Sequence, residues 1–240
     1  MDRDSDTARD SADYCAALVR AQDRDRFLAA QFAEPSARGR LLALLAMDAE
    51  MARAARAVHE PILLRMRIQW WREALAAAFS GGPPPRQPVL IALVDAHAQI
   101  PFDGDSFSPL LAARERDFAV QPIAGVDDAV AFADASAGSL AILALRTLGV
   151  VNAAAAVAAR SAGIAFGLAA MNPTARGSLR EAARDHMAVA RARKSDVPDA
   201  ARAVMLWVTA AEARLRAADP IRPLPLLPLV LAWRAWRRTY

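Results

Sequence analysis

Apolar residues recur every three to four positions along most of the chain, separated by alanines, arginines and acids. This spacing places them on one face of an α-helix, and no stretch shows the strict alternation typical of a β-strand. Proline and glycine end most of the periodic stretches. We expect helices over residues 13–32, 36–58, 62–79, 88–99, 107–118, 126–149, 152–171, 178–193, 198–218 and 229–240.

These segments predict an all-α protein, a compact bundle of about nine or ten helices. No uninterrupted apolar run reaches the roughly 20 residues that a membrane-spanning helix needs, because arginine or a carboxylate divides every long stretch. We therefore expect the most apolar segments to be core helices.

Three segments differ in composition. Residues 1–12 alternate acids with small polar residues and lack the basic and apolar regions of a secretory signal, so we expect a disordered leader. Residues 13–218 contain no linker and should form one helical domain. Residues 219–240 begin with spaced prolines and continue as an apolar and basic tail.

The tail places Leu226, Leu229, Trp233 and Trp236 among arginines. This arrangement is typical of a helix that lies on a membrane surface or docks on a partner protein. The alternative is that the tail folds back onto the bundle, and the sequence leaves both open.

The overall charge gives little support to nucleic-acid binding. The net charge of +4 comes almost wholly from arginine, since Lys194 is the only lysine, and the basic residues are dispersed among acids without interleaved aromatics. Cys15 is the only cysteine, which excludes an intramolecular disulfide. We expect no nucleic-acid partner and a reducing, cytoplasmic environment.

Several short motifs stand out in the sequence. The segment Leu41–Glu50 reads Leu-Leu-Ala-Leu-Leu-Ala-Met-Asp-Ala-Glu, and a more specific Gln-Trp-Trp-Arg element occupies Gln69–Arg72. Less specific motifs are Ala137-Gly138 with Gly149, and Gly163–Leu168. Together these motifs resemble the squalene/phytoene synthase family and follow its order over roughly residues 13 to 215. The resemblance implies an isoprenoid-synthase-like bundle, a fold whose enzymes join two prenyl diphosphates head to head.

Enzymes of this family need carboxylates at fixed spacing. Acids at i and i+4 share a helix face and hold Mg²⁺, which neutralises the diphosphate leaving group. In this chain the positions of the first motif fall on Ala52, Arg53 and Arg56, and the second falls near residues 170–178, where no carboxylate occurs. The resemblance therefore implies a site without catalytic residues, metal or other cofactor.

Three acids are candidate replacements for the missing metal ligands: Asp48, Glu50 and Asp134. Asp48 and Glu50 are two residues apart, so their side chains point about 200° from each other on a helix and cannot chelate one ion. Mg²⁺ is expected only if such acids replace the usual ligands.

Four arginines can be interpreted in two ways. Arg53, Arg56, Arg65 and Arg72 lie on two helices that face each other in the family fold, where they would line a basic cavity for a diphosphate or another anion. The alternative, which we favour, is a salt-bridged surface.

With both metal motifs lost, the chain resembles a degenerate subfamily that includes the mitochondrial complex I assembly factor. This resemblance implies a non-catalytic assembly factor or scaffold for a membrane respiratory complex, peripheral on the cytoplasmic face of a bacterial inner membrane. One alternative is a Mg²⁺-dependent head-to-head prenyltransferase. Another is a non-catalytic protein that binds an isoprenoid or lipid.

Overall fold

The computed structural model describes residues 2–57, 60–82, 85–102, 104–118, 123–171, 176–217 and 224–240, and every regular element in these ranges is helical. The predicted all-α class is confirmed. The α-helices are α1 (Asp2–Gln22), α2 (Arg24–Ala30), α3 (Pro35–Ala57), α4 (Pro61–Phe79), α5 (Pro88–Gln99), α6 (Ser108–Phe118), α7 (Val126–Ala133), α8 (Ser139–Thr147), α9 (Ala153–Ala170), α10 (Arg176–Ala192), α11 (Arg202–Arg216) and α12 (Leu227–Arg237).

Two of the expected helices are each divided, so the described chain has more helices than the nine or ten expected. Asp23 separates α1 from α2 because its side chain accepts a hydrogen bond from the Arg26 backbone and starts a new helix. A π-helical turn, Asp134–Gly138, separates α7 from α8. Pattern alone does not show either break, since the apolar spacing continues across both.

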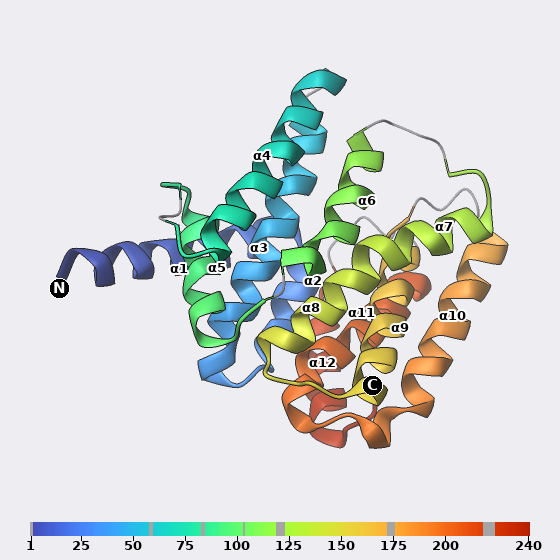
Figure 1. The fold of residues 1–240 in the computed structure, drawn as a ribbon. Helices are drawn as coiled ribbons and strands as arrows, with labels where there is room; N and C mark the ends of the chain where they lie inside the picture. Colours follow the sequence, from blue (N-terminus) through green and yellow to red (C-terminus); the bar gives the residue numbers. More distant parts are fainter. Residues whose placement is uncertain are drawn as a thin grey trace.

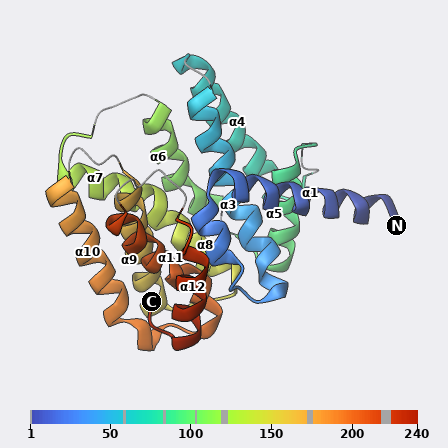
Figure 2. The same ribbon diagram turned by 180° about the vertical axis from the view of Figure 1, so that it is seen from behind.

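The expected disordered leader is helical in the structure, because α1 begins at Asp2. Asp6 lies near the start of this helix, where negative charge is favourable. The first turns of α1 extend beyond the body of the bundle (Figures 1 and 2). Ser11, by contrast, is already buried.

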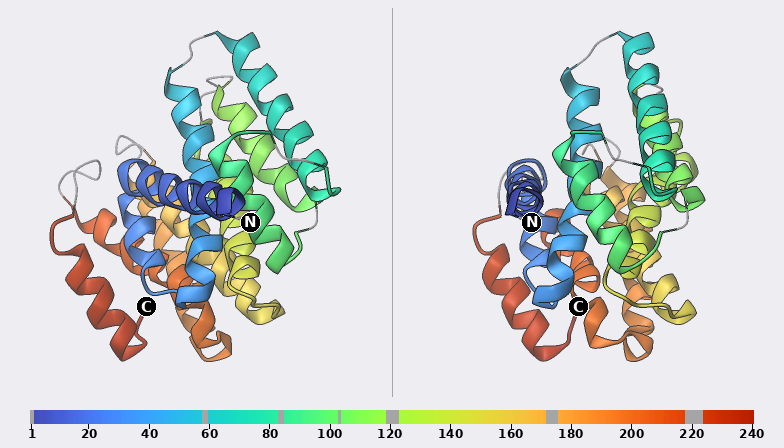
Figure 3. Two further views of the ribbon diagram at one scale, coloured as in Figure 1. Left: turned by 90° about the vertical axis from the view of Figure 1, so that its left-hand side faces the viewer. Right: turned by 60° about the vertical axis from the view of Figure 1, so that its left-hand side comes forward.

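Two groups of helices meet in the middle of the molecule. In one, α9 contacts α7, α8, α10 and α11; in the other, α3 contacts α1, α5 and α6 (Figure 1). Contacts of α3 with α8 and of α2 with α11 join the groups. The end of α3 and the start of α4 project beyond the rest of the bundle (Figure 3).

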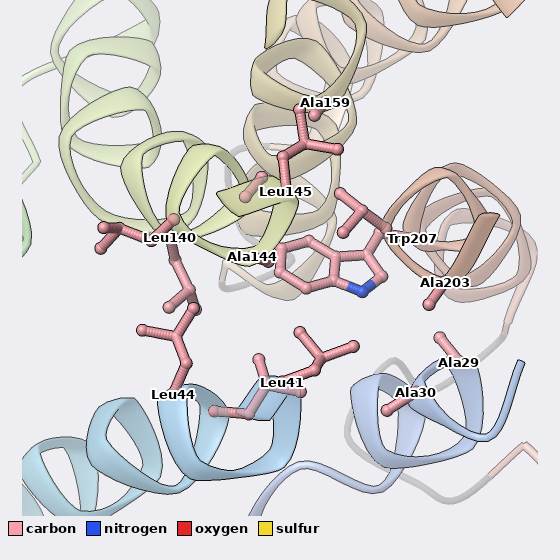
Figure 4. Close-up of a cluster of buried hydrophobic side chains, with 14 of the residues drawn as sticks. Ala29, Ala30, Leu41, Leu44, Leu140, Ala144, Leu145, Ala159, Ala203 and Trp207 are labelled. Carbon is pink, nitrogen blue, oxygen red and sulfur yellow. The ribbon is translucent and has the colours of Figure 1, made fainter. Parts of the chain in front are cut away.

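The core between these groups combines a few large side chains with many alanines. Figure 4 shows the wholly buried Trp207 of α11 lying against leucines and alanines of α2, α3, α8 and α9. Its labelled neighbours are Ala29, Ala30, Leu41, Leu44, Leu140, Ala144, Leu145, Ala159 and Ala203. Small side chains let the helix backbones approach closely, and the indole ring fills the space that remains.

Two helical stretches, Val126–Thr147 and Ala153–Ala170, are long and apolar enough to cross a membrane by length and composition. This differs from the expectation that no apolar stretch reaches that length, because isolated charges do not lower the mean hydropathy enough. More than half of each stretch is buried inside the bundle, 56% and 61% respectively, as in core helices.

Among the described glycines, Gly163 of α9 has the closest neighbours. A Cβ atom at this position would lie 2.2 Å from the Ala137 carbonyl oxygen of the π-helical turn and 2.9 Å from the Ala141 Cβ atom. Only glycine fits this crossing without moving backbone atoms. Gly39 of α3 is the matched contrast, because a Cβ atom added there would meet nothing within 4 Å.

We expect Gly163→Ala to lower the free energy of unfolding by about 1–3 kcal/mol or more, because the added methyl group overpacks a contact with backbone. Gly39→Ala should instead raise it by up to about 1 kcal/mol, since alanine favours helix and meets no neighbour. Urea unfolding of both variants measures the difference. Equal effects would contradict the close crossing.

Candidate functional site

A buried carboxylate lies at the centre of the candidate site. Asp48 of α3 is 2% exposed, and both of its oxygens accept hydrogen bonds from arginines. Arg114 of α6 donates to Oδ1 from Nε at 3.0 Å and from Nη2 at 2.5 Å, and Arg26 of α2 donates to Oδ2 at 3.1 Å. The carboxylate is therefore fully used by two guanidinium groups.

Arg26 is also enclosed by aromatic rings. Its guanidinium carbon lies 5.1 Å from the centroid of Phe166 on α9 and 5.2 Å from that of Trp207 on α11. Its Nε donates to Asp23. Cation–π contacts are strongest for cations shielded from water, as here, where the Arg26 side chain is 11% exposed.

A second pair adjoins the first across Phe166. Arg214 of α11 lies 5.7 Å from the Phe166 centroid and donates from Nε to Asp25 Oδ2 at 2.6 Å. We define the central ion-pair cluster as Asp23, Asp25, Arg26, Asp48, Arg114 and Arg214 with the rings of Phe166 and Trp207. Its three carboxylates and three guanidiniums balance in formal charge.

Burial affects the two most buried acids of the cluster differently. Burial by itself would raise the pKa of Asp48, but Arg114 and Arg26 outweigh it and hold this pKa below its ordinary value. Burial raises the pKa of Asp25, and Arg214 only partly offsets this effect. The two arginines thus favour the ionised form of Asp48.

Glu50, the second acid of the motif, has a separate set of partners. It is 4% exposed, and its Oε1 lies 2.7 Å from Arg53 Nη2 and 3.7 Å from Arg67 Nη2 of α4. Burial and the neighbouring Glu50 raise the pKa of Tyr14. Asp48 and Glu50 have different partners because side chains two residues apart on a helix point about 200° from each other.

The other candidates lie away from the central cluster. Asp134 pairs with Arg160 of α9 through two 2.5 Å hydrogen bonds, with the Arg160 side chain 54% exposed. Ala52 of α3 is partly exposed and offers no ligand atom.

The four arginines considered as an anion site are not brought together where they are described. Arg53 pairs with Glu50, Arg72 pairs with Glu115 of α6 at 2.8 Å, and Arg65 is exposed. The Arg56 side chain lies outside the described part. The described three resemble a salt-bridged surface more than the lining of an anion site.

The residues present do not fit Mg²⁺. Among the described side chains, no group of three or more histidines, cysteines and acids is placed to hold a metal ion. A metal at Asp48 would have to displace Arg26 or Arg114, and oxygen ligands from further acids would still be needed. Residues 172–175 of the second motif lie outside the described residues.

Sequence reasoning missed Arg26, Arg114 and Arg214, the cations of the cluster. One signal was available: Asp48 follows the apolar run Leu41–Met47 on a helix expected to be buried. A buried carboxylate needs a cation or a metal. The pattern does not show which of the many arginines supplies it.

Fold and site together define an isoprenoid-synthase-like helical bundle whose centre is occupied by arginine–carboxylate pairs. The profile of the squalene/phytoene synthase family matches residues 19–171, more than half of the chain. The chain belongs to the squalene/phytoene synthase family.

Curated relatives include NADH dehydrogenase (ubiquinone) complex I, assembly factor 6, from Bos taurus and Homo sapiens. The chain is 27% and 26% identical to these two proteins over 155 residues, which cover 65% of this chain and 46% of each relative. The chain thus matches about half the length of these relatives.

Solved structures of lower identity show the same fold. Squalene synthase HpnC from Alicyclobacillus acidocaldarius superposes with a TM-score of 0.72 at 18% identity, covering 87% of this chain and 92% of that one. A dehydrosqualene synthase in complex with ligand gives 0.71 at 14% identity, covering 97% and 98%.

We expect Asp48→Asn to lower the free energy of unfolding by roughly 3–5 kcal/mol, because it removes the buried carboxylate charge that Arg26 and Arg114 share. The matched control is Glu115→Gln, which removes the half-exposed partner of Arg72 and should cost about 1 kcal/mol or less. Urea unfolding at neutral pH compares them. Similar small losses in both variants would show that the Asp48 pairs contribute little.

Stability should also fall in acid for a reason specific to Asp48. Because its folded pKa is lowered, its stabilising contribution is complete above the ordinary aspartate pKa of about 3.9 and is lost as the pH falls through the folded value. Unfolding free energies measured from neutral pH downward should therefore decline below about pH 4, and less steeply in Asp48→Asn. Parallel curves would contradict this assignment.

Proposed function

We propose that this protein is a non-catalytic member of the squalene/phytoene synthase family that acts as an assembly factor or scaffold for a membrane respiratory complex. One observation carries the non-catalytic part. Asp48, the most buried acid beside the first metal motif, has both oxygens committed to arginines.

Chemistry explains why this arrangement opposes catalysis. Ionising an allylic diphosphate needs a dense positive charge at the leaving group, which family enzymes obtain from Mg²⁺ bound to carboxylates. In this chain the motif positions are Ala52, Arg53 and Arg56. The cluster arginines do not substitute for the metal, because Asp23, Asp25 and Asp48 already neutralise them.

The partner is proposed from the relatives named as complex I assembly factor 6. They are distant, and this chain matches less than half of their length. A respiratory complex of this kind is therefore the proposed client, and the cytoplasmic side of a bacterial inner membrane the proposed location. No cofactor is needed for such a role.

We expect no Mg²⁺-dependent binding of farnesyl diphosphate in calorimetry and no turnover of farnesyl or geranylgeranyl diphosphate. An active squalene synthase assayed in parallel is the positive control. Mg²⁺-dependent turnover that Asp48→Asn abolishes, with Glu115→Gln unaffected, would revive the prenyltransferase alternative. Metal-independent binding of the diphosphate or of a lipid would favour the carrier alternative.

The scaffold part needs a separate test in cells. We expect deletion of the encoding gene to lower the amount of assembled complex I on native gels, with recovery when this chain is supplied again. The active squalene synthase is the control and should not restore assembly. Unchanged complex I in the deletion strain would refute the proposed client while leaving the non-catalytic assignment intact.

A further inference from the structure

The tail helix α12 is fixed to the bundle along one face. Leu227, Leu231 and Ala235 are buried, and α12 contacts α11 and α2. The tail therefore does fold back onto the bundle, which was one of the two possibilities left open by the sequence. The opposite face of α12 is exposed.

Polar contacts hold the same anchored face. Glu212 of α11 lies 2.5 Å from Arg191 of α10 and 3.4 Å from Arg234 of α12. Arg191 also donates from Nε to the Tyr240 carbonyl at 2.7 Å. Glu212 thus links α10, α11 and α12, so the orientation of α12 is set by the bundle.

The opposite face of α12 exposes a continuous apolar stripe. Its members recur at intervals of three and four residues, and we call them the outer stripe: Leu226, Leu229, Val230, Trp233 and Trp236. Leu229 is 69% exposed and Trp236 is 79% exposed. Single exposed apolar residues are ordinary, but a contiguous stripe marks an interaction surface. Figures 2 and 3 show α12 on the outside of the molecule.

Positive charge accompanies the outer stripe. The guanidinium of Arg237 lies 5.4 Å from the Trp233 ring, and among the described residues no carboxylate pairs with it. Arg234 and Arg238, in contrast, pair with Glu212 and Asp199. Residues 224–240 contain no aspartate or glutamate, so the exposed face is apolar and cationic.

We propose that the outer stripe of α12 binds the surface of an anionic lipid bilayer. Leucines insert among acyl chains, indole rings favour the headgroup boundary, and arginine attracts lipid phosphates. Helix α12 has 11 residues, too few to span a bilayer, so it would lie in the plane of the interface.

The composition of α12 favours lipid over a protein partner. From Leu226 to Arg237 no side chain carries a hydroxyl, amide or carboxylate group. Protein interfaces surround their apolar centre with such groups, which pair specifically across the contact. A fluid bilayer requires only apolar burial and charge. This inference stands independently of the proposed function.

The test is flotation of the full chain with vesicles of phosphatidylcholine alone or mixed with phosphatidylglycerol. We expect binding to the anionic vesicles that weakens as salt rises. Changing Leu229→Ser together with Trp236→Ser should lower partitioning at least about tenfold, because two large apolar side chains are lost. Arg237→Gln should lower it about fivefold by removing one cation.

The matched control is Ile123→Ser with Val151→Ser, two apolar side chains that are 42% and 94% exposed and lie far apart in the sequence, outside any apolar stripe. This variant should bind vesicles as the unchanged chain does. All the substituted side chains are exposed, so the urea midpoints should agree and exclude misfolding as the cause.

Three results would overturn the inference. The first is no flotation of the unchanged chain, which would leave a protein partner as the occupant of the outer stripe. The second is equal flotation of the unchanged chain and the α12 double variant. The third is binding that neither salt nor Arg237→Gln changes, because an anionic surface would then not be recognised.

Discussion

The ion pairs of Asp48 are the interaction on which the centre of the molecule depends. A carboxylate removed from water is unstable unless cations and hydrogen bonds replace its hydration. Arg26 and Arg114 provide both, and they come from α2 and α6, so the single charge on α3 joins three helices. Arg26 extends the connection to α9 and α11 through the rings of Phe166 and Trp207. Removing the Asp48 carboxylate would therefore disturb two helix groups at once. In a wholly apolar centre, removing one side chain would disturb only the packing around it.

The same pairs limit the chemistry that the fold can support. A helical bundle of this family places acids where a metal and a diphosphate can meet, but the Asp48 carboxylate already accepts hydrogen bonds from two guanidiniums, with which a metal would have to compete. Burying the pairs is costly unless their charges stay matched, so a metal that displaced Arg26 or Arg114 from Asp48 would disturb the charge balance of the cluster. We propose that this bundle has kept its architecture while its centre serves stability.

Most of the fold could be predicted from the sequence, because its helices are bounded by local signals. Pro35, Pro61 and Pro88 begin helices where the pattern predicted breaks, and the helix expected over residues 229–240 corresponds to α12. The cap at Asp23 and the π-helical turn at 134–138 were missed, because neither interrupts the apolar period. The cluster was missed for a different reason. Asp48 pairs with residues 22 and 66 positions away in the sequence, and only the packing of the helices selects those two arginines.

The use of arginine rather than lysine connects the centre with the surface. A guanidinium can donate to a carboxylate from two nitrogens while its flat face lies on an aromatic ring, and a lysine ammonium cannot do both. Arg26 donates to Asp48 and to Asp23 from two different nitrogens while it lies against the Phe166 ring, and the exposed Arg237 lies against the Trp233 ring. An arginine-rich chain with lysine only at Lys194 can therefore place cations in its core and on an apolar face without leaving them unpartnered. The position of Glu212 completes this arrangement, because by pairing with Arg234 it fixes which side of α12 faces the bundle and which side stays outward. The interior ion pairs and the orientation of the outer stripe thus follow from one physical property, the ability of a planar cation to bind an acid and a ring together.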